Sequence, residues 1–252
     1  MEQQKLTELL SEMTLDEKID QLLQLAAAFY SDKAEEKTGP MGDLGLTQEN
    51  INNAGTTLGV SGAKEAIRVQ KEYIANNRLN IPTILMADII HGFRTIFPIP
   101  LGLGSSWDLA AAEKMAEVSA KEAAVSGLHV TFSPMVDLVR DPRWGRVMES
   151  TGEDPYLNSR FAEAFVKGYQ GDDLRTDFNR VAACVKHFAA YGAAIGGRDY
   201  NTVNMSERQL RESYLPGYKA ALDAGAKLVM TSFNTVDGIP ATANRWLFRD
   251  VL

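Results

Sequence analysis

The stretch Val181-Ala182-Ala183-Cys184-Val185-Lys186-His187-Phe188 is a short apolar run that ends in two polar side chains. Runs of this length and composition are typical of buried β-strands. Helix-start signals lie on both sides of it: Asp154-Pro155 before it, and the capping box Ser206-Glu207-Arg208-Gln209 after it. A strand between two helices predicts a βα repeat, and such repeats pair their strands in parallel.

The same alternation extends in both directions along the chain. Further strands are predicted at Thr83–Ile90, His129–Val139 and Lys227–Phe233, with weaker candidates at Gln21–Leu25 and Thr56–Val60. Helices are predicted at 14–25, 63–76, 108–126, 154–171 and 206–225, and a long surface loop at 31–55. The predicted fold class is therefore α/β, a (β/α)8 TIM-barrel-like domain that is incomplete, with about six of the eight strands.

Composition and charge exclude several classes of protein. The 33 acidic and 26 basic residues give a net charge of −7, which disfavours a nucleic-acid partner. The single cysteine, Cys184, cannot form an internal disulfide and is predicted to be a buried thiol. The chain has no basic start followed by an apolar stretch, and no apolar window long enough to span a membrane, so we expect a cytoplasmic protein without a membrane partner.

Polar side chains gather where the predicted strands end. Asp88 stands near the end of one strand, Asp137 closes the next, Lys186 and His187 close the third, and Ser232 closes the fourth. Barrels of this class build their active sites at the carboxyl ends of the strands. Any one of these residues could be a solvated loop residue or part of a buried ion pair, but their joint occurrence predicts a site.

The residue types indicate the ligand. Mixed charged donors and acceptors suit a neutral molecule covered in hydroxyl groups, such as a sugar. Other chemistries lack their motifs: there is no phosphate-binding Walker loop, and Gly102-Leu103-Gly104 lacks the third glycine of a dinucleotide fingerprint. Three separated histidines give no zinc spacing, so no metal site is expected.

Several motifs together resemble the family 3 glycoside hydrolases, particularly bacterial β-glucosidases. The resemblance covers essentially the whole chain and is carried by Met13–Lys18, Asp88–Gly92, Asp141–Arg146, Glu149 with Gly152–Pro155, Lys186–Phe188 and Met230–Asn234. It implies an exo-acting, retaining hydrolase that removes terminal β-linked glucose from glucosides or β-gluco-oligosaccharides without a cofactor.

The resemblance also implies roles for individual residues. Asp88, Arg146, Lys186 and His187 would hold the hydroxyls of the terminal sugar, and Met230 would form a wall of the same subsite. Ser232, at the end of the last strand of that set, is added as a binding candidate from its position.

Two departures from the family's pattern qualify these expectations. Many relatives carry a tyrosine where this chain has Phe233, so the hydroxyl beside the nucleophile is missing. Residues 1–252 are also expected to be the N-terminal part of the barrel, truncated before the strand that bears the nucleophile. No catalytic residue is therefore assigned, and the 252 residues alone are expected to be inactive.

An incomplete barrel leaves sheet edges open. The expected macromolecular partner is therefore the missing C-terminal portion as a second chain, or a further copy through self-association. Two alternatives in function stay open: a β-xylosidase of the same family, and a non-catalytic sugar-binding or assembly module. The family's β-N-acetylhexosaminidases are disfavoured, because Ala189–Ala193 stands where they carry a histidine-containing loop.

Overall fold

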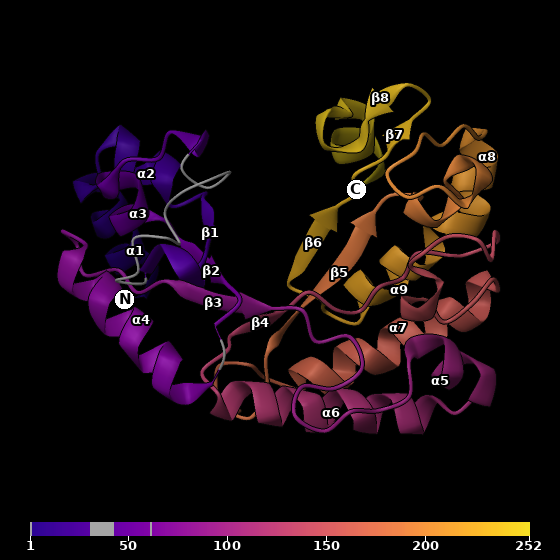
Figure 1. Cartoon of the computed structure of the whole chain (residues 1–252), viewed down its shortest axis with the longest axis horizontal. Coiled ribbons are helices and arrows are strands. Elements are labelled where there is room, and N and C mark those ends of the chain that lie inside the picture. Colours follow the sequence, from indigo (N-terminus) through magenta and orange to yellow (C-terminus); the bar gives the residue numbers. More distant parts are fainter. Residues whose placement is uncertain (1, 31–42, 61) are drawn as a thin grey trace. The chain divides into compact units, whose positions relative to one another are not determined.

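The computed structural model describes residues 2–30, 43–60 and 62–252. They form two compact units, Met1–Ala87 with Ser126–His129, and Asp88–Val125 with Val130–Leu252. Each unit holds three parallel strands with helices between them, which confirms the predicted α/β class (Figure 1).

In the first unit, three short strands are paired in parallel in the order β1, β2, β3. Residue Leu25 of β1 lies opposite Thr57 of β2, which lies opposite Leu85 of β3. The elements of this unit are α1 Glu2–Glu12, α2 Leu15–Asp20, β1 Gln24–Ala26, α3 Gln48–Asn53, β2 Thr56–Leu58, α4 Ala63–Asn76 and β3 Ile84–Ala87.

The capping box predicted at the start of α2 is present. The Thr14 hydroxyl accepts a hydrogen bond from the Glu17 amide at 3.2 Å, and the Glu17 carboxylate accepts one from the Thr14 amide at 2.8 Å. Arg78 also donates to the Glu17 carboxylate, and these hydrogen bonds, with that of Arg78 the largest contribution, lower its pKa to about 2. The start of α2 is thereby tied to the segment that follows α4.

The second unit contains the parallel strands β4, β5 and β6. Thr131 of β4 lies opposite Ala183 of β5, and Cys184 of β5 lies opposite Leu228 of β6. Its elements are α5 Pro100–Ser106, α6 Leu109–Val125, β4 Val130–Thr131, α7 Pro155–Gln170, β5 Ala182–Phe188, α8 Glu207–Gln209, α9 Pro216–Asp223, β6 Leu228–Thr231 and the antiparallel hairpin β7 Thr235–Val236 with β8 Ile239–Pro240.

Helix α7 is the central helix of this unit and packs against both α6 and α9 (Figure 1). The approach of α6 is close because α7 has Gly168 at the contact. A Cβ atom on Gly168 would lie 2.3 Å from the Glu113 carbonyl oxygen and 2.6 Å from the Ala116 Cβ. Cys184 in β5 is a buried, free cysteine, as predicted. Its burial raises the pKa of the thiol to about 11.

Three expectations about secondary structure were wrong. Residues 48–53, placed in the predicted loop, form α3, which has its own capping box between Thr47 and Asn50; residues 31–42 of that loop lie outside the described part. The strand expected over 129–139 pairs regularly only at Val130–Thr131; beyond it Ser133, Pro134 and Val136 bond to β5 only through an isolated bridge, and Pro134 has no amide hydrogen to extend the ladder. The helix expected over 206–225 is divided, since Pro216 has no amide hydrogen to continue it.

We predict that Gly168→Ala destabilises the protein, although alanine is the better helix former by about 1 kcal/mol. The added methyl group would force α6 and α7 apart at a contact that cannot shift cheaply. Urea unfolding should show a loss of about 1–3 kcal/mol in the free energy of unfolding.

The matched control is Gly102→Ala in α5, where the new Cβ would meet its nearest neighbours at 3.7 and 3.9 Å, an ordinary contact distance. This variant should be as stable as the parent or more so. Equal behaviour of the two variants would show that the α6–α7 approach does not depend on the glycine.

Candidate functional site

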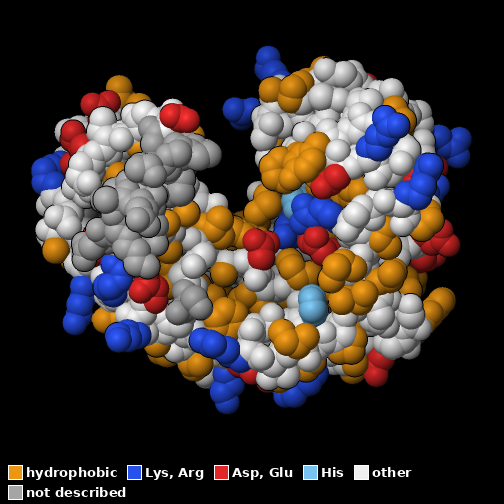
Figure 2. Space-filling view, viewed as in Figure 1, with side chains coloured by type: hydrophobic (Ala, Val, Ile, Leu, Met, Phe, Trp, Pro, Cys, Tyr) orange, Lys and Arg blue, Asp and Glu red, His pale blue; other side chains and the backbone are white. Residues whose placement is uncertain are grey.

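The centre of the candidate site is a buried ammonium group. Lys186, near the end of β5, has a side chain only 3% exposed, and its Nζ lies 2.7 Å from Oδ1 of Asp88 and 4.0 Å from Oε2 of Glu149. The Asp88 side chain is 57% exposed, so its carboxylate lies between the buried lysine and solvent. A buried charge requires such partners, because an unpaired one is strongly destabilising. Figure 2 shows acidic, basic and histidine side chains gathered on one face of this unit.

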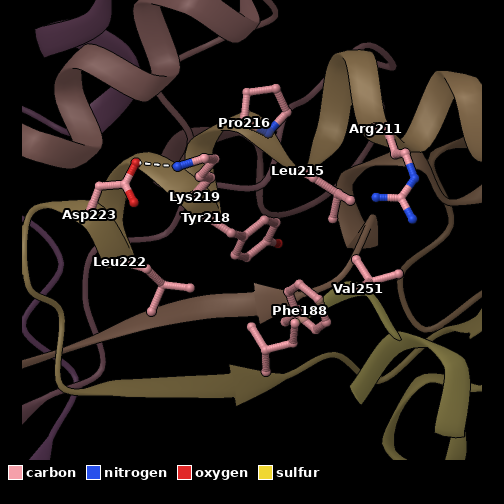
Figure 3. Close-up of a pocket in the computed structure, with 10 residues that line it drawn as sticks. Phe188, Arg211, Leu215, Pro216, Tyr218, Lys219, Leu222, Asp223 and Val251 are labelled. Atoms are coloured by element: carbon pink, nitrogen blue, oxygen red, sulfur yellow. Dashed lines mark hydrogen bonds and ion pairs between the residues drawn. The ribbon is translucent and has the colours of Figure 1, made fainter. Parts of the chain in front are cut away.

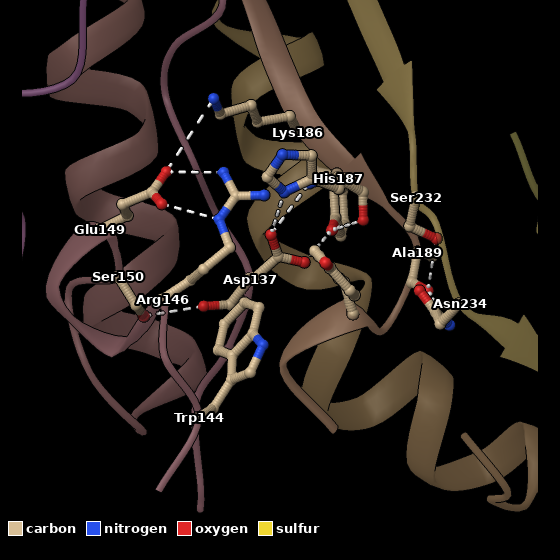
Figure 4. A network of polar contacts seen from close by, with 12 residues as sticks. Asp137, Trp144, Arg146, Glu149, Ser150, Lys186, His187, Ala189, Ser232 and Asn234 are labelled. Atoms are coloured by element: carbon tan, nitrogen blue, oxygen red, sulfur yellow. Dashed lines mark hydrogen bonds and ion pairs between the residues drawn. The ribbon is translucent and has the colours of Figure 1, made fainter. Parts of the chain in front are cut away.

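Arg146 and Glu149 form a second, bidentate pair beside Lys186. The guanidinium Nε and Nη2 lie 2.7 and 2.8 Å from the two carboxylate oxygens of Glu149 (Figure 4). These hydrogen bonds raise the pKa of Arg146, which also lies over the Tyr191 ring at 5.7 Å. Glu149 thus joins Arg146 and Lys186 into one network with alternating charge.

His187 is oriented by a buried carboxylate. Oδ2 of Asp137 lies 2.7 Å from His187 Nδ1 and accepts the His187 backbone amide at 3.1 Å, while Oδ1 accepts the Tyr218 hydroxyl at 3.0 Å. Since a carboxylate oxygen accepts hydrogen bonds, we assign the ring proton to Nδ1, which leaves Nε2 directed away from Asp137 (Figure 4). Burial, with Asp137 adding to it, raises the pKa of Tyr218, so its hydroxyl stays a donor.

An aromatic layer supports the polar network. Trp144 and Tyr191 pack edge to face in a buried cluster with Met135 and Val139. Both rings donate to Asp199: the Trp144 indole at 3.0 Å, and the Tyr191 hydroxyl through a short hydrogen bond. Burial acts to raise the pKa of Asp199, but the hydrogen bonds from Tyr191 and Trp144 outweigh it and lower that pKa.

Four of the predicted binding residues lie in this network: Asp88 and Lys186 are paired, Lys186 and Arg146 share Glu149, and His187 follows Lys186 in β5. The other two are placed differently. Met230 is half-buried within β6, and the buried Ser232 hydroxyl donates to the Ala189 carbonyl at 3.3 Å (Figure 4). Substrate binding by all six residues stays a prediction.

The sequence-based assignment did not give roles to four residues of the network. The sequence places Asp137 at a strand end and Glu149 in a motif, but predicts neither the contact of Asp137 with His187 nor that of Glu149 with Arg146. Tyr191 and Asp199 lie in the loop after β5, where the sequence has no periodic pattern, and they are linked to Arg146 only by tertiary contacts. The spacing of three residues between Arg146 and Glu149 indicates that the two side chains can pair.

No group of three or more histidine, cysteine, aspartate or glutamate side chains suited to a metal ion occurs among residues 2–30, 43–60 and 62–252. A separate groove of about 460 Å³ lies beside α9, with Phe188, Leu215, Leu222 and Val251 among its lining (Figure 3). The ion pair in it, Lys219 with Asp223, is on the exposed face of α9. The groove is mainly apolar and lacks the convergent charged groups of the Lys186 network.

Comparison with known proteins identifies the family. The model of the glycosyl hydrolase family 3 N-terminal domain matches residues 14–252. The chain belongs to glycosyl hydrolase family 3.

Individual relatives of this family 3 chain agree with that assignment. The crystal structure of a β-glucosidase from Listeria innocua in complex with glucose is 60% identical, with a TM-score of 0.96 over 100% of this chain and 36% of its own. The periplasmic β-glucosidase of Salmonella typhimurium is 44% identical over 98% of this chain, and a β-xylosidase of Formosa agariphila is 39% identical over 71%. The structural match confirms the predicted partial TIM-barrel-like domain. The chain spans about a third of the length of the relatives it matches.

The prediction of a cytoplasmic protein was wrong, because the Salmonella relative, similar over nearly the whole chain, is a periplasmic enzyme. Export depends on a leader segment that is not part of the folded domain, so the composition of the domain does not report the compartment. In the part of this family 3 chain that the structure describes, no helix combines the length and apolar character needed to cross a bilayer.

We predict that Asp137→Ala lowers the free energy of unfolding by about 3 kcal/mol, because it leaves the His187 amide, the His187 ring and one bond of Tyr218 without an acceptor. The control is Tyr218→Phe, which removes one hydroxyl and should cost only about 1 kcal/mol. Urea unfolding of both variants measures the difference. If Asp137→Ala unfolded at the same urea concentration as the wild type, the hydrogen bonds of the Asp137 carboxylate would not stabilise the fold around His187.

Proposed function

We propose that this chain carries the part of an exo-acting, retaining β-glucosidase that binds the terminal glucosyl unit. The observation that carries the proposal is the Asp88–Lys186–Glu149–Arg146 network, with His187 beside it. Carboxylates and cationic donors alternate on one face of this network. A sugar hydroxyl can donate to such a carboxylate and accept from such a cation. The identities of 44% and 60% to β-glucosidases support the same reaction class.

The charge of the network favours a neutral ligand. Two carboxylates, Asp88 and Glu149, are matched by the two cations Lys186 and Arg146, while Asp137 is paired with His187. Asp88 is the most exposed of the charged groups that contact Lys186, so an anionic substrate would meet a carboxylate first. In the proposed site Asp88 and His187 accept or donate at the sugar hydroxyls, while Lys186 and Arg146 add charged donors and Met230 and Ser232 line the strand beside them.

Catalysis is proposed for the whole protein rather than for these 252 residues. In a retaining enzyme one carboxylate forms the glycosyl-enzyme and a second acts as acid and base. Every carboxylate of the network is already paired with a cation, a histidine or a tyrosine, which suits binding. We therefore assign the two catalytic groups to the two thirds of the relatives' length that this chain does not match, and propose that portion as its partner.

A β-xylosidase is the second candidate, because relatives of that name match 64–71% of the chain at 38–39% identity. Xylose lacks the hydroxymethyl group of glucose. Titration of the chain with glucose and with xylose therefore separates the β-glucosidase from the β-xylosidase candidate.

We predict that glucose binds to the 252-residue chain and that Asp88→Ala weakens this binding at least about tenfold, because charge-assisted hydrogen bonds to the sugar are lost. Glucuronate should bind more weakly than glucose. Ligand-observed NMR titration gives the dissociation constants, with D-xylose as the test of the second candidate.

The matched control is Asp223→Ala. Asp223 is 64% exposed at the side chain and pairs with Lys219 at 2.6 Å, much as Asp88 pairs with Lys186, but it lies on α9. This variant should bind glucose like the parent. Absence of glucose and xylose binding by the parent chain would refute the proposed function.

We also predict that the 252-residue chain does not hydrolyse 4-nitrophenyl β-D-glucoside at an enzymatic rate, since both catalytic carboxylates are assigned elsewhere. Release of nitrophenol, followed against a protein-free control, measures this. Mass spectrometry of the protein from its native source then asks whether a second polypeptide accompanies it. Ordinary enzymatic turnover by the isolated chain would contradict the assignment.

A further inference from the structure

One buried ring contacts two of the proposed sugar-binding residues. Tyr191, in the loop after β5, is buried, and the Arg146 guanidinium lies 5.7 Å from its ring centroid. The His187 ring packs edge to face on the same ring, with 5.3 Å between the centroids. A tilt of Tyr191 would alter its contacts with both residues, because protein interiors are closely packed. The position of Tyr191 is therefore a condition for the geometry of the polar network.

A single carboxylate oxygen holds Tyr191 in place. Oδ1 of Asp199, an exposed residue, accepts hydrogen bonds from the Tyr191 hydroxyl and from the Trp144 indole nitrogen, the latter at 3.0 Å. The hydroxyl has one hydrogen, so while it donates to Asp199 it can only accept from other groups. Hydrogen bonding to Glu149, and to a smaller extent to Tyr191, raises the pKa of Arg146. Asp199 thus leaves the acceptor side of the hydroxyl to the guanidinium.

Two glycines bring the loop that carries Asp199 against the segment that carries Trp144. A Cβ atom on Gly192 would lie 2.3 Å from the Leu138 carbonyl oxygen, and one on Gly197 would lie 2.9 Å from the Trp144 amide nitrogen. Larger side chains at these positions would force the loop away, because the neighbouring atoms belong to the backbone. The close approach places the Asp199 carboxylate within hydrogen-bond distance of the Trp144 indole.

The backbone beside Asp199 is also held in an unfavourable conformation. The next residue, Tyr200, has a φ of +63°, in the left-handed region that is costly for a tyrosine. The Ile195 amide closes the loop by donating to the Thr202 carbonyl at 3.1 Å. Such a conformation persists only where the surrounding contacts hold it, which indicates that the position of Asp199 is a built feature of the fold.

We propose that Asp199 is a positioning residue of the sugar site, whose carboxylate acts through Tyr191 to keep Arg146 and His187 oriented toward the sugar hydroxyls. This inference rests on the proposed function. Without the carboxylate, the Tyr191 hydroxyl could turn its hydrogen toward Arg146, where a donor would meet a donor. The ring would also lose the bond that ties it to the same oxygen as Trp144.

The test is a double-mutant cycle on the full 252-residue chain, with glucose binding measured by ligand-observed NMR titration. Asp199→Ala and Tyr191→Phe should each weaken binding about fivefold, because each removes the same hydrogen bond. The double variant should bind no more weakly than either single variant, since residues that act through one contact do not have additive effects. Asp199→Asn keeps an oxygen that can accept both donors and should bind within about twofold of the parent.

Asp173→Ala is the matched control. Oδ1 of Asp173 likewise accepts two hydrogen bonds, from the amide and from Nε of Arg175, but Asp173 lies in the segment that precedes β5. This variant should bind glucose like the parent. Tyr191→Phe keeps the ring and its packing, so the test does not depend on the folding of Asp199→Ala.

Three results would overturn this inference and leave the proposed function standing. Additive losses in the double variant would mean that Asp199 contacts the sugar itself. An Asp199→Asn variant as weak as Asp199→Ala would make the charge, and not the accepted hydrogen bonds, the cause. Parent-like binding by Asp199→Ala or Tyr191→Phe would remove the contact from the site. A parent chain that binds neither glucose nor xylose would overturn both the inference and the proposed function.

Discussion

The buried ammonium group of Lys186 is the constraint on which the site depends. A lysine 3% exposed within a parallel strand is tolerated only where carboxylates surround it, and here Asp88 and Glu149 do so. Asp88 follows β3 in the chain, and Glu149 lies between β4 and α7, so one charged atom brings together segments that are about 40 to 100 residues apart. Satisfying this charge also directs one carboxylate toward solvent, where a ligand can reach it.

Asp137 provides the second constraint at the same strand. It receives the backbone amide and ring of His187 together with the Tyr218 hydroxyl, so it connects β5 to α9 inside the unit. Asp137 is 1% exposed, and all of its printed hydrogen bonds go to groups of the protein. The two carboxylates therefore differ in their surroundings. Asp88 is exposed to solvent while it pairs with Lys186, and the buried Asp137 holds the His187 imidazole in a single orientation.

The residues that the sequence predicted well are those fixed by strand periodicity. Lys186 and His187 close a run whose burial pattern is set by its own composition, and Asp88 follows another such run, so their positions could be inferred without coordinates. Residues fixed by tertiary contacts could not. Tyr191 and Asp199 depend on the packing of Trp144, and Gly168 shows its role only when the α6 backbone is placed against it.

The errors in secondary structure have a similar origin. The apolar residues at 132–139 resemble a strand because they are buried, yet only isolated backbone bonds join them to β5, and Met135 and Val139 pack in the cluster with Trp144 and Tyr191. Hydrophobicity reports burial and not the partner of the backbone. The prediction of the compartment was wrong for a related reason, because the forces that fold a domain are the same on either side of a membrane.

The charged groups and the loop beside them are held by different parts of the fold. The charged groups come from strand ends and from a short turn, and the parallel pairing sets the positions of those strand ends. Tyr200 is carried by a loop held through Asp199 and the Ile195–Thr202 bond, and exchange of that loop would alter the neighbouring surface without disturbing Lys186. Apart from Asp199, the loop and the charged groups can therefore vary independently in sequence, and the relatives of this chain include both β-glucosidases and β-xylosidases.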